Sequence, residues 1–180
     1  MAKLVGATYA NSLFEIAKEL NKIDEIYKEL SFIAETFKND KDFYQFFITP
    51  KVSIAKRKEV IENIYGDKVS REVVNFLKIL LDKNRANEIF SIKLFFDDLL
   101  DKNRNIKRVT IESVIELTDE HKKKLINKLS ELTQSEIILI NVIKPEVLGG
   151  IIMRIDNEVI DNSIVSKLKS IEDSILKMII

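Results

Sequence analysis

Residues 101–108 read DKNRNIKR, a polar run with a single apolar residue, Ile106. The apolar composition of the chain changes across this run. All ten Phe and all four Tyr precede residue 97, whereas the later apolar residues are Ile, Leu and Val with two Met. Domain boundaries commonly fall in polar stretches between separate hydrophobic cores. We therefore predict two domains, residues 1–104 with an aromatic core and residues 105–180 with an aliphatic core.

On the N-terminal side of that run, the sequence predicts helices only. Apolar residues recur three and four positions apart, and the chain has only four Gly and two Pro, too few for many tight turns. Pro50 is expected to end the third helix. Ser53 and Ser70 are expected to cap the fourth and fifth helices, and Gly66 to follow the fourth. We predict a six-helix bundle with short connections. The fourth helix is expected to place these apolar side chains inward: Ile54, Ile61, Ile64 and Tyr65.

On the C-terminal side, the apolar pattern changes from helical spacing to alternation. Alternation predicts a half-buried strand over residues 109–117, and Thr118 is expected to cap the helix that follows. The run Ile137–Ile143 is apolar at every position but one, which predicts a strand covered on both faces. The helix between these two strands is expected to turn the following residues inward: Leu125, Ile126, Leu129 and Leu132.

A hairpin and a final helix complete the second domain. Residues 149–155 and 158–160 flank Asp156-Asn157, a pair that tolerates the positive φ of a tight turn. Ser163 is expected to cap the last helix. The fold class is therefore mostly α, with an N-terminal six-helix bundle followed by a small α+β domain of order β-α-β-β-α. The last helix is expected to carry one apolar stripe: Ile164, Leu168, Ile171 and Ile175.

Composition argues against most catalytic chemistries. Lys plus Arg and Asp plus Glu are both 29, and a net charge of zero argues against nucleic-acid binding and against a polybasic membrane-surface protein. The chain has no Cys and one His, His121, with no nucleophile or orienting carboxylate indicated beside it. We expect no catalytic residue, no metal site and no cofactor. Without a secretory or transit segment or a run of about 18 apolar residues, the chain is expected to be soluble and cytoplasmic.

Three clusters could suggest chemistry, but each has a simpler interpretation. Asp156, Glu158 and Asp161 lack the spacing of a calcium-binding loop and are interpreted as turn and cap residues. Gly149-Gly150 precedes an apolar strand rather than a helix, which favours a backbone bend over a phosphate loop. The basic residues within 102–108 are interpreted as a solvated linker.

Three motifs, in order along the chain, resemble one known family. Residues 8–19, TYANSLFEIAKE, are similar to the Y-A-x-x-L-F-x-x-A-x-E start of the F-type ATP synthase delta subunit, whose mitochondrial member is the oligomycin-sensitivity-conferring protein. Residues 75–85, NFLKILLDKNR, resemble the family's F-L-x-x-L-x-x-x-x-R stretch. Residues 148–163, LGGIIMRIDNEVIDNS, are similar to its L-G-G strand, turn and Asp-x-Ser signature. The signature residues are Gly149, Gly150, Asp161 and Ser163.

The resemblance implies a mechanical role rather than a catalytic one. It implies a non-catalytic stator subunit of the peripheral stalk, one copy per complex, which lets rotor torque drive ATP synthesis coupled to proton or sodium transport. The first domain would bind the N-terminal helix of an alpha subunit between its first and fifth helices, and the second would bind the C-terminal ends of the b subunits. Carried over by position, the groove would contain Tyr9, Ser12, Leu13, Ile16, Phe76, Ile79 and Lys83.

By the same resemblance, the chain would lie at the cytoplasmic face of the bacterial plasma membrane and meet the membrane only through the complex. One alternative from the residues alone is a helical adaptor that binds an amphipathic helix of an unrelated partner. Core stripes and docking stripes look alike in a sequence, so either protein could present this helical pattern.

Overall fold

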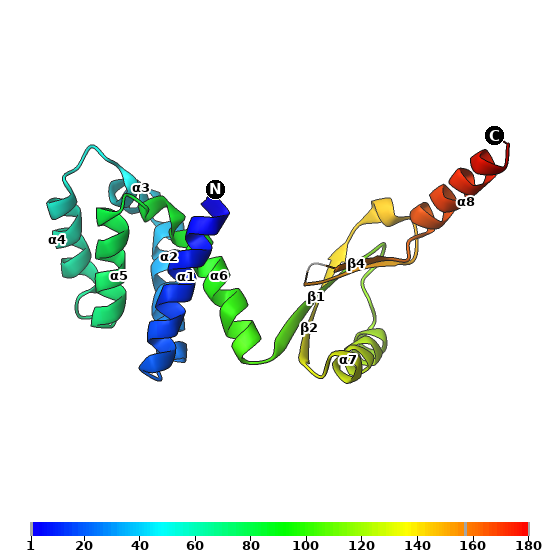
Figure 1. The fold of residues 1–180 in the computed structure, drawn as a ribbon, viewed down its shortest axis with the longest axis horizontal. Coiled ribbons are helices and arrows are strands. Elements are labelled where there is room, and N and C mark those ends of the chain that lie inside the picture. The colour runs from blue at the N-terminus through cyan, green and yellow to red at the C-terminus, as the bar shows by residue number, and fades with distance from the viewer. Residues whose placement is uncertain (1, 157, 180) are drawn as a thin grey trace. The chain divides into compact units, whose positions relative to one another are not determined.

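The computed structural model describes residues 2–156 and 158–179, with side chains described for residues 5–156 and 158–171. The chain divides between Leu100 and Asp101 into two compact units (Figure 1). This division lies four residues before the boundary expected from composition, inside the last turn of a helix. The Asp101 carboxylate accepts hydrogen bonds from the guanidinium of Arg108, so the end of that helix is bonded to the following strand.

Over the described residues 2–103, the chain forms the six predicted α-helices together with one short 3₁₀ turn. Their bounds are α1 Ala2–Glu19, α2 Ile23–Asn39, α3 Lys41–Ile48, α4 Ile54–Tyr65, α5 Arg71–Asp82, η1 Ala86–Glu88 and α6 Ile89–Asn103.

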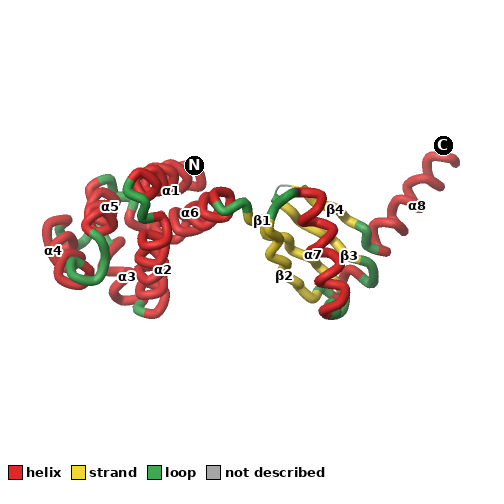
Figure 2. The backbone as a smooth tube through the Cα atoms, turned by 90° about the horizontal axis from the view of Figure 1, so that it is seen from below, coloured by secondary structure: helices red, strands yellow, loops and turns green. Residues whose placement is uncertain are grey.

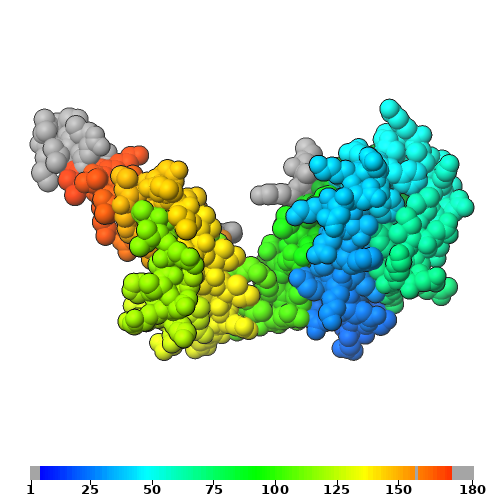
Figure 3. All heavy atoms as spheres, turned by 180° about the vertical axis from the view of Figure 1, so that it is seen from behind, coloured from blue at the N-terminus to red at the C-terminus, as the bar shows by residue number. Residues whose placement is uncertain are grey.

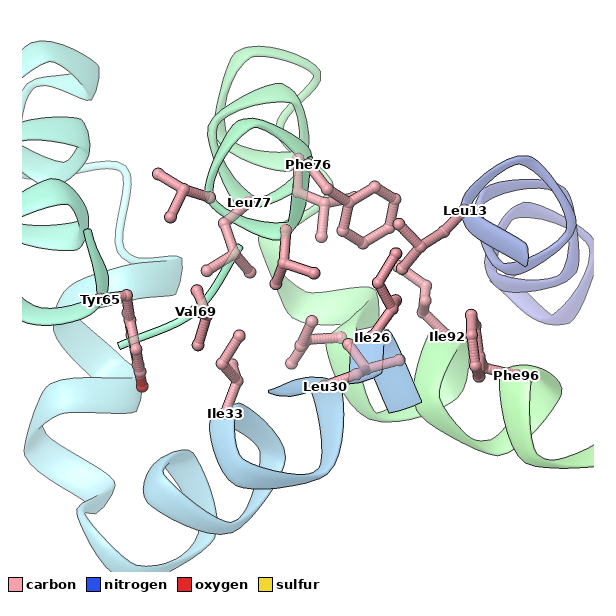
Figure 4. Packing of buried hydrophobic residues seen from close by; sticks show 14 of the residues in the cluster. Leu13, Ile26, Leu30, Ile33, Tyr65, Val69, Phe76, Leu77, Ile92 and Phe96 are labelled. Atoms are coloured by element: carbon pink, nitrogen blue, oxygen red, sulfur yellow. The ribbon is translucent and has the colours of Figure 1, made fainter. Parts of the chain in front are cut away.

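Apolar side chains from all six helices meet in one core (Figure 4). Ile26, Leu30 and Ile33 of α2 are fully buried and point into the space enclosed by the other helices. Aromatic rings fill one end of this core, where Phe37 stacks on Phe47 at a centroid distance of 4.8 Å. Most of the aromatic residues that precede residue 97 therefore share one core.

Two local expectations for this unit are wrong. Ser70 occupies the N-cap position of α5, but its side chain makes no bond to its own helix; instead its amide and hydroxyl both donate to the carboxylate of Glu29 in α2. Ile54 is exposed rather than inward. The first turn of α4 packs instead through Arg57, whose Nη1 donates to the carbonyl oxygen of Phe47 at 3.0 Å. Ser53 does cap α4, accepting from the Lys56 amide.

The C-terminal unit has the predicted order β-α-β-β-α around a four-stranded sheet, with β1 Ile106–Ser113, α7 Asp119–Thr133, β2 Glu136–Ile143, η2 Pro145–Val147, β3 Ile151–Ile155, β4 Glu158–Asp161 and α8 Ile164–Ile179. The strand order is β2-β1-β3-β4. β1 pairs parallel with β2 and antiparallel with β3, so that Val109 lies opposite both Leu139 and Ile155. α7 covers one face of the sheet (Figure 2) and packs on it through Leu129.

Three expectations for this unit need correction. β1 ends at Ser113, where the Ser113 hydroxyl donates to the carbonyl oxygen of Ile115, and Ile115 itself is 74% exposed. β2, which lies at an edge of the sheet, was expected to be covered on both faces, but Ile140 and Ile143 are exposed. Leu132, in the last turn of α7, is 73% exposed at the rim of a groove rather than inside the core.

The hairpin and the last helix form where they were predicted. Asp156 has a φ of 51° in the turn between β3 and β4. In α8, Ile164, Leu168 and Ile171 are all exposed, and the side chain of Ile175 lies outside the described part of the chain. None of the helices in the described ranges combines the length and apolar character that crossing a bilayer requires.

Candidate partner-binding surfaces

The first candidate surface lies where α1 and α5 meet. The ring of Tyr9 in α1 contacts the ring of Phe76 in α5 edge to face, with centroids 6.3 Å apart. Leu13 of α1 points toward the ring of Phe76 (Figure 4). The fold therefore brings together two segments more than sixty residues apart, both of which were nominated from the sequence.

The apolar residues that the resemblance implies for this groove are of two kinds, buried and exposed. Leu13 and Phe76 are buried members of the core, and Tyr9 is partly buried against it. Ile16 and Ile79 are 44% and 47% exposed, which is unusual for isoleucines on helices that otherwise bury their apolar residues. The exposed isoleucines therefore offer a partner apolar contacts, and the buried side chains beneath them hold the two helices together.

Two polar residues from the same predicted set, Ser12 and Lys83, complete this surface. Ser12 is exposed, and its hydroxyl donates to the Thr8 carbonyl at 3.0 Å within the same helix. Lys83 caps the C-terminus of α5 and is exposed. An amphipathic helix could pack its apolar side on the isoleucines. The small Ser12 would let that helix approach closely, and Lys83 lies at the end of α5, outside the apolar contact. We call this set the α1–α5 surface: Tyr9, Ser12, Leu13, Ile16, Phe76, Ile79 and Lys83.

The second candidate site is the junction between β4 and α8, where the predicted signature residues meet. Gly150 has a φ of +77°, and a Cβ there would collide with the Asn162 carbonyl oxygen. A Cβ on Gly149 would collide with the Ile164 side chain, and the Gly149 carbonyl accepts from the Ile164 amide at 2.9 Å. Only a chain without side chains at 149 and 150 lets the start of α8 approach this closely.

Asp161 and Ser163 close the same junction from the other side. The Asp161 carboxylate accepts the Ser163 amide at 2.8 Å and the Ser166 hydroxyl at 2.6 Å. The hydrogen bond from Ser166, followed by those from Ser163, lowers the pKa of Asp161. The buried Ser163 hydroxyl caps α8 by accepting the Ser166 amide at 3.2 Å. These bonds set the direction in which α8 leaves the sheet.

The C-terminal unit also exposes apolar surface. A groove of about 410 Å³ runs between the end of α7 and the hairpin, lined in part by Leu132, Met153 and Ile160. The exposed face of α8 carries the residues that we call the α8 stripe, namely Ile164, Leu168 and Ile171. On the sheet, Glu112 is paired with Lys144 at 2.8 Å and with Arg154 at 3.1 Å, and these bonds lower the pKa of its carboxyl group.

Sequence reasoning missed a groove between α2 and α6. It encloses about 740 Å³ and is lined by Phe32 and Leu94, both exposed, together with the partly buried Tyr27 and Phe90. The two helices lie side by side in Figure 3, where α2 is blue and α6 is green. A signal was present in the sequence, since Phe32 and Leu94 are apolar residues outside the core-facing stripes of their helices.

The residues considered for other chemistry are engaged in structure or lie on the surface. Asp156 pairs with Lys107 at 2.9 Å, which agrees with a turn residue. His121 is exposed, and its amide donates to the Thr118 hydroxyl as the capped first turn of α7 requires. Within the described ranges, His, Asp and Glu side chains nowhere gather in a group of three that could hold a metal ion.

A family model described as ATP synthase delta (OSCP) subunit matches residues 5–175. The chain belongs to this family. A delta subunit of ATP synthase from Clostridium kluyveri is 31% identical over 98% of each chain, and one from Clostridioides difficile is 32% identical over 99% of each. As a member of the family, the chain is a stator component of the peripheral stalk of an F-type ATP synthase.

A solved structure supports the fold assigned to this family member. A chain in the Toxoplasma gondii mitochondrial ATP synthase hexamer superposes with a TM-score of 0.72, at 19% identity, over 95% of this chain and 97% of that one. A likeness of this kind shows that helical bundle and α+β domain occur together, in this order, in both chains.

Proposed function

We propose that this chain is a non-catalytic link that holds the catalytic head of the synthase to its peripheral stalk through two separate attachments. The N-terminal unit binds the N-terminal helix of an alpha subunit on the α1–α5 surface. The C-terminal unit binds the C-terminal ends of the b subunits. The observation that carries the proposal is the pair of exposed isoleucines, Ile16 and Ile79, on the two helices that the Tyr9–Phe76 contact joins.

The chemistry of the α1–α5 surface supports a helical partner. Amphipathic helices dock into apolar grooves through residues spaced three and four apart, which matches the two-helix arrangement of α1 and α5. Nanomolar affinity corresponds to about −12 kcal/mol, which a helix buried on such a surface can reach. Because a stator must hold through many turnovers under torque, slow dissociation matters more than fast association.

Exposed apolar surface supports the second attachment. The α8 stripe and the groove beside Leu132 leave aliphatic side chains in water that a stalk helix could cover. The close approach of the backbone at Gly150 and the hydrogen bonds at Gly149 and Asp161 give α8 a defined direction from which to present that stripe. Because both attachments are on one chain, binding at one raises the effective concentration of the second partner at the other.

The proposed setting is the cytoplasmic face of a bacterial plasma membrane, with one copy in each complex and torque coupled to proton or sodium transport. The chain reaches the membrane only through the other subunits. Its match to delta subunits over 98% and 99% of each chain supports a stator role rather than that of an adaptor for an unrelated partner.

The test is the affinity of a synthetic peptide of the alpha-subunit N-terminal helix for the full chain, measured by calorimetry. Ile79→Asp should weaken binding about a hundredfold, because an isoleucine contact is lost and a charge is desolvated. Leu94→Asp is the matched control, since Leu94 is 66% exposed on α6 in the other groove. Unchanged affinity in the Ile79 variant, or equal loss in the Leu94 variant, would contradict the proposed alpha site.

A further inference from the structure

The N-terminus of α5 is held by a carboxylate from another helix. Ser70 has the extended backbone of an N-cap, with φ −62° and ψ 153°, yet its hydroxyl makes no bond to the amides of its own helix. Glu29 of α2 accepts the Ser70 amide at 2.7 Å and the Ser70 hydroxyl at 2.6 Å. In a capping box, the side chain of a Glu within the same helix accepts the amide of the N-cap residue, as Glu29 does here for Ser70. Here the Glu comes from forty-one residues away.

The position of Glu29 on α2 explains how it reaches α5. It follows Ile26 by three residues and precedes Ile33 by four, and both are fully buried, so Glu29 lies at the border of the core-facing side. Its carboxylate stands at the start of α5, where the helix dipole favours negative charge. Both bonds to Ser70 are charge-assisted and short, which makes them stronger than neutral ones.

The same helix, α2, also supports α1. Ile26 and Leu30 of α2 point into the space between Leu77 on α5 and Leu13 on α1 (Figure 4). The C-terminal end of α5 is tied separately to α4, where Asp82 pairs with Lys58 at 2.6 Å. The N-terminal end of α5 is tied to α2 by Glu29. Between these two ties lie Phe76 and Ile79, the α5 contribution to the α1–α5 surface.

We infer that Glu29 is a positioning residue for the α1–α5 surface. By fixing the start of α5 against α2, it sets the separation between Ile16 and Ile79 before a partner binds. A prearranged surface avoids the ordering cost that a movable helix would add to each binding event. This inference rests on the proposed alpha-subunit site, although Glu29 itself touches no partner in it.

The experiment compares three full-length variants for binding of the alpha-subunit N-terminal peptide, at a temperature where circular dichroism shows each one folded. Glu29→Ala should weaken binding about tenfold, as changes within a supporting network do without touching the ligand. Glu29→Gln should stay within about threefold of the parent, because its amide can accept from the Ser70 amide and donate to the Ser70 hydroxyl. Glu35→Ala, which removes an exposed charge from the same helix, should leave affinity unchanged.

Hydrogen exchange supplies the second measurement. In Glu29→Ala, the amides at the start of α5, around Val73 and Val74, should exchange faster, and Glu29→Gln should restore their protection. Parent-like affinity in Glu29→Ala would overturn the inference, as would equal losses in the Ala and Gln variants or an equal loss in Glu35→Ala. If Ile79→Asp weakens binding while Glu29→Ala does not, the alpha site stands and only the positioning role fails. If neither variant changes affinity, the alpha site itself is wrong and the positioning role fails with it.

Discussion

The two units place their apolar side chains differently. The N-terminal unit buries aromatic and aliphatic residues from all six helices in one continuous core. In the C-terminal unit, the buried cluster is small and aliphatic: Val109, Ile111, Leu129, Ile137 and Ile155. Much of its remaining apolar surface, on β2, the hairpin and the α8 stripe, is exposed.

This difference indicates how each unit depends on its surroundings. A domain of about eighty residues buries a smaller fraction of its surface than a larger one and is correspondingly marginal in stability. Under the proposed function, we therefore expect the N-terminal unit to present its partner surface on a preformed core, and the C-terminal unit to cover part of its exposed apolar surface when a partner binds. The tyrosines offer a direct readout, since all four lie in the N-terminal unit and their fluorescence follows that unit alone.

The largest expected effect tests the core of the N-terminal unit. Phe37→Ala should destabilise this unit by about 4 kcal/mol, because the ring is almost fully buried and its removal leaves a cavity. The tyrosine-fluorescence transition in urea should shift, while the exchange protection of amides in β1 should not. Phe32→Ala is the control on the same helix, since Phe32 is exposed, and it should cost less than about 1 kcal/mol. Equal losses in both variants would contradict the burial described for Phe37.

A smaller effect is expected at the β4–α8 junction. Gly150→Ala should destabilise the C-terminal unit by about 2 kcal/mol, because it adds a Cβ at positive φ against the Asn162 carbonyl oxygen. Exchange protection in β3 should fall while the tyrosine transition stays in place. A coupled loss in both units would show that they unfold together and would remove the contrast between them.

The smallest effect is a difference in pH response between the units. Hydrogen bonds and ion pairs lower the pKa of Glu112 and Asp161 in the folded state, so their contribution is present at neutral pH and is lost as the pH falls below their unfolded values of 4.5 and 3.8. Burial raises the pKa of Tyr44 and Tyr65, so the N-terminal unit loses stability as the pH rises above 10.0.

Acid should therefore reduce exchange protection first in the C-terminal unit, and alkali should shift the tyrosine transition first. Asp161→Asn should flatten the acid response of the C-terminal unit. The reverse order of loss in acid, measured by exchange at pH 3 to 5 (roughly the range of carboxyl titration), would contradict this assignment of the carboxylates.

Local rules predicted much of the fold because their causes are local. Pro50 and Ser53 delimit the end of α3 and the start of α4, and the Asp156 turn forms where its tolerance of positive φ was expected. Rules that depend on distant neighbours failed. Ser70 was expected to cap its own helix, but its hydroxyl donates to Glu29 of α2 and makes no bond to α5. The apolar run in β2 was expected to be covered on both faces, but Ile140 and Ile143 are exposed.

The sequence by itself determined the type and order of the elements, the change from aromatic to aliphatic composition, and the motifs that identify the family. Periodicity and motif spacing are properties of short segments, so they can be recognised before folding is considered. Only the tertiary structure decided that Leu13 is buried while Ile16 is exposed, and that Gly150 and Asp161 meet at the start of α8. Burial and close approach depend on what packs from elsewhere in the chain, and a helical stripe carries no record of its neighbours.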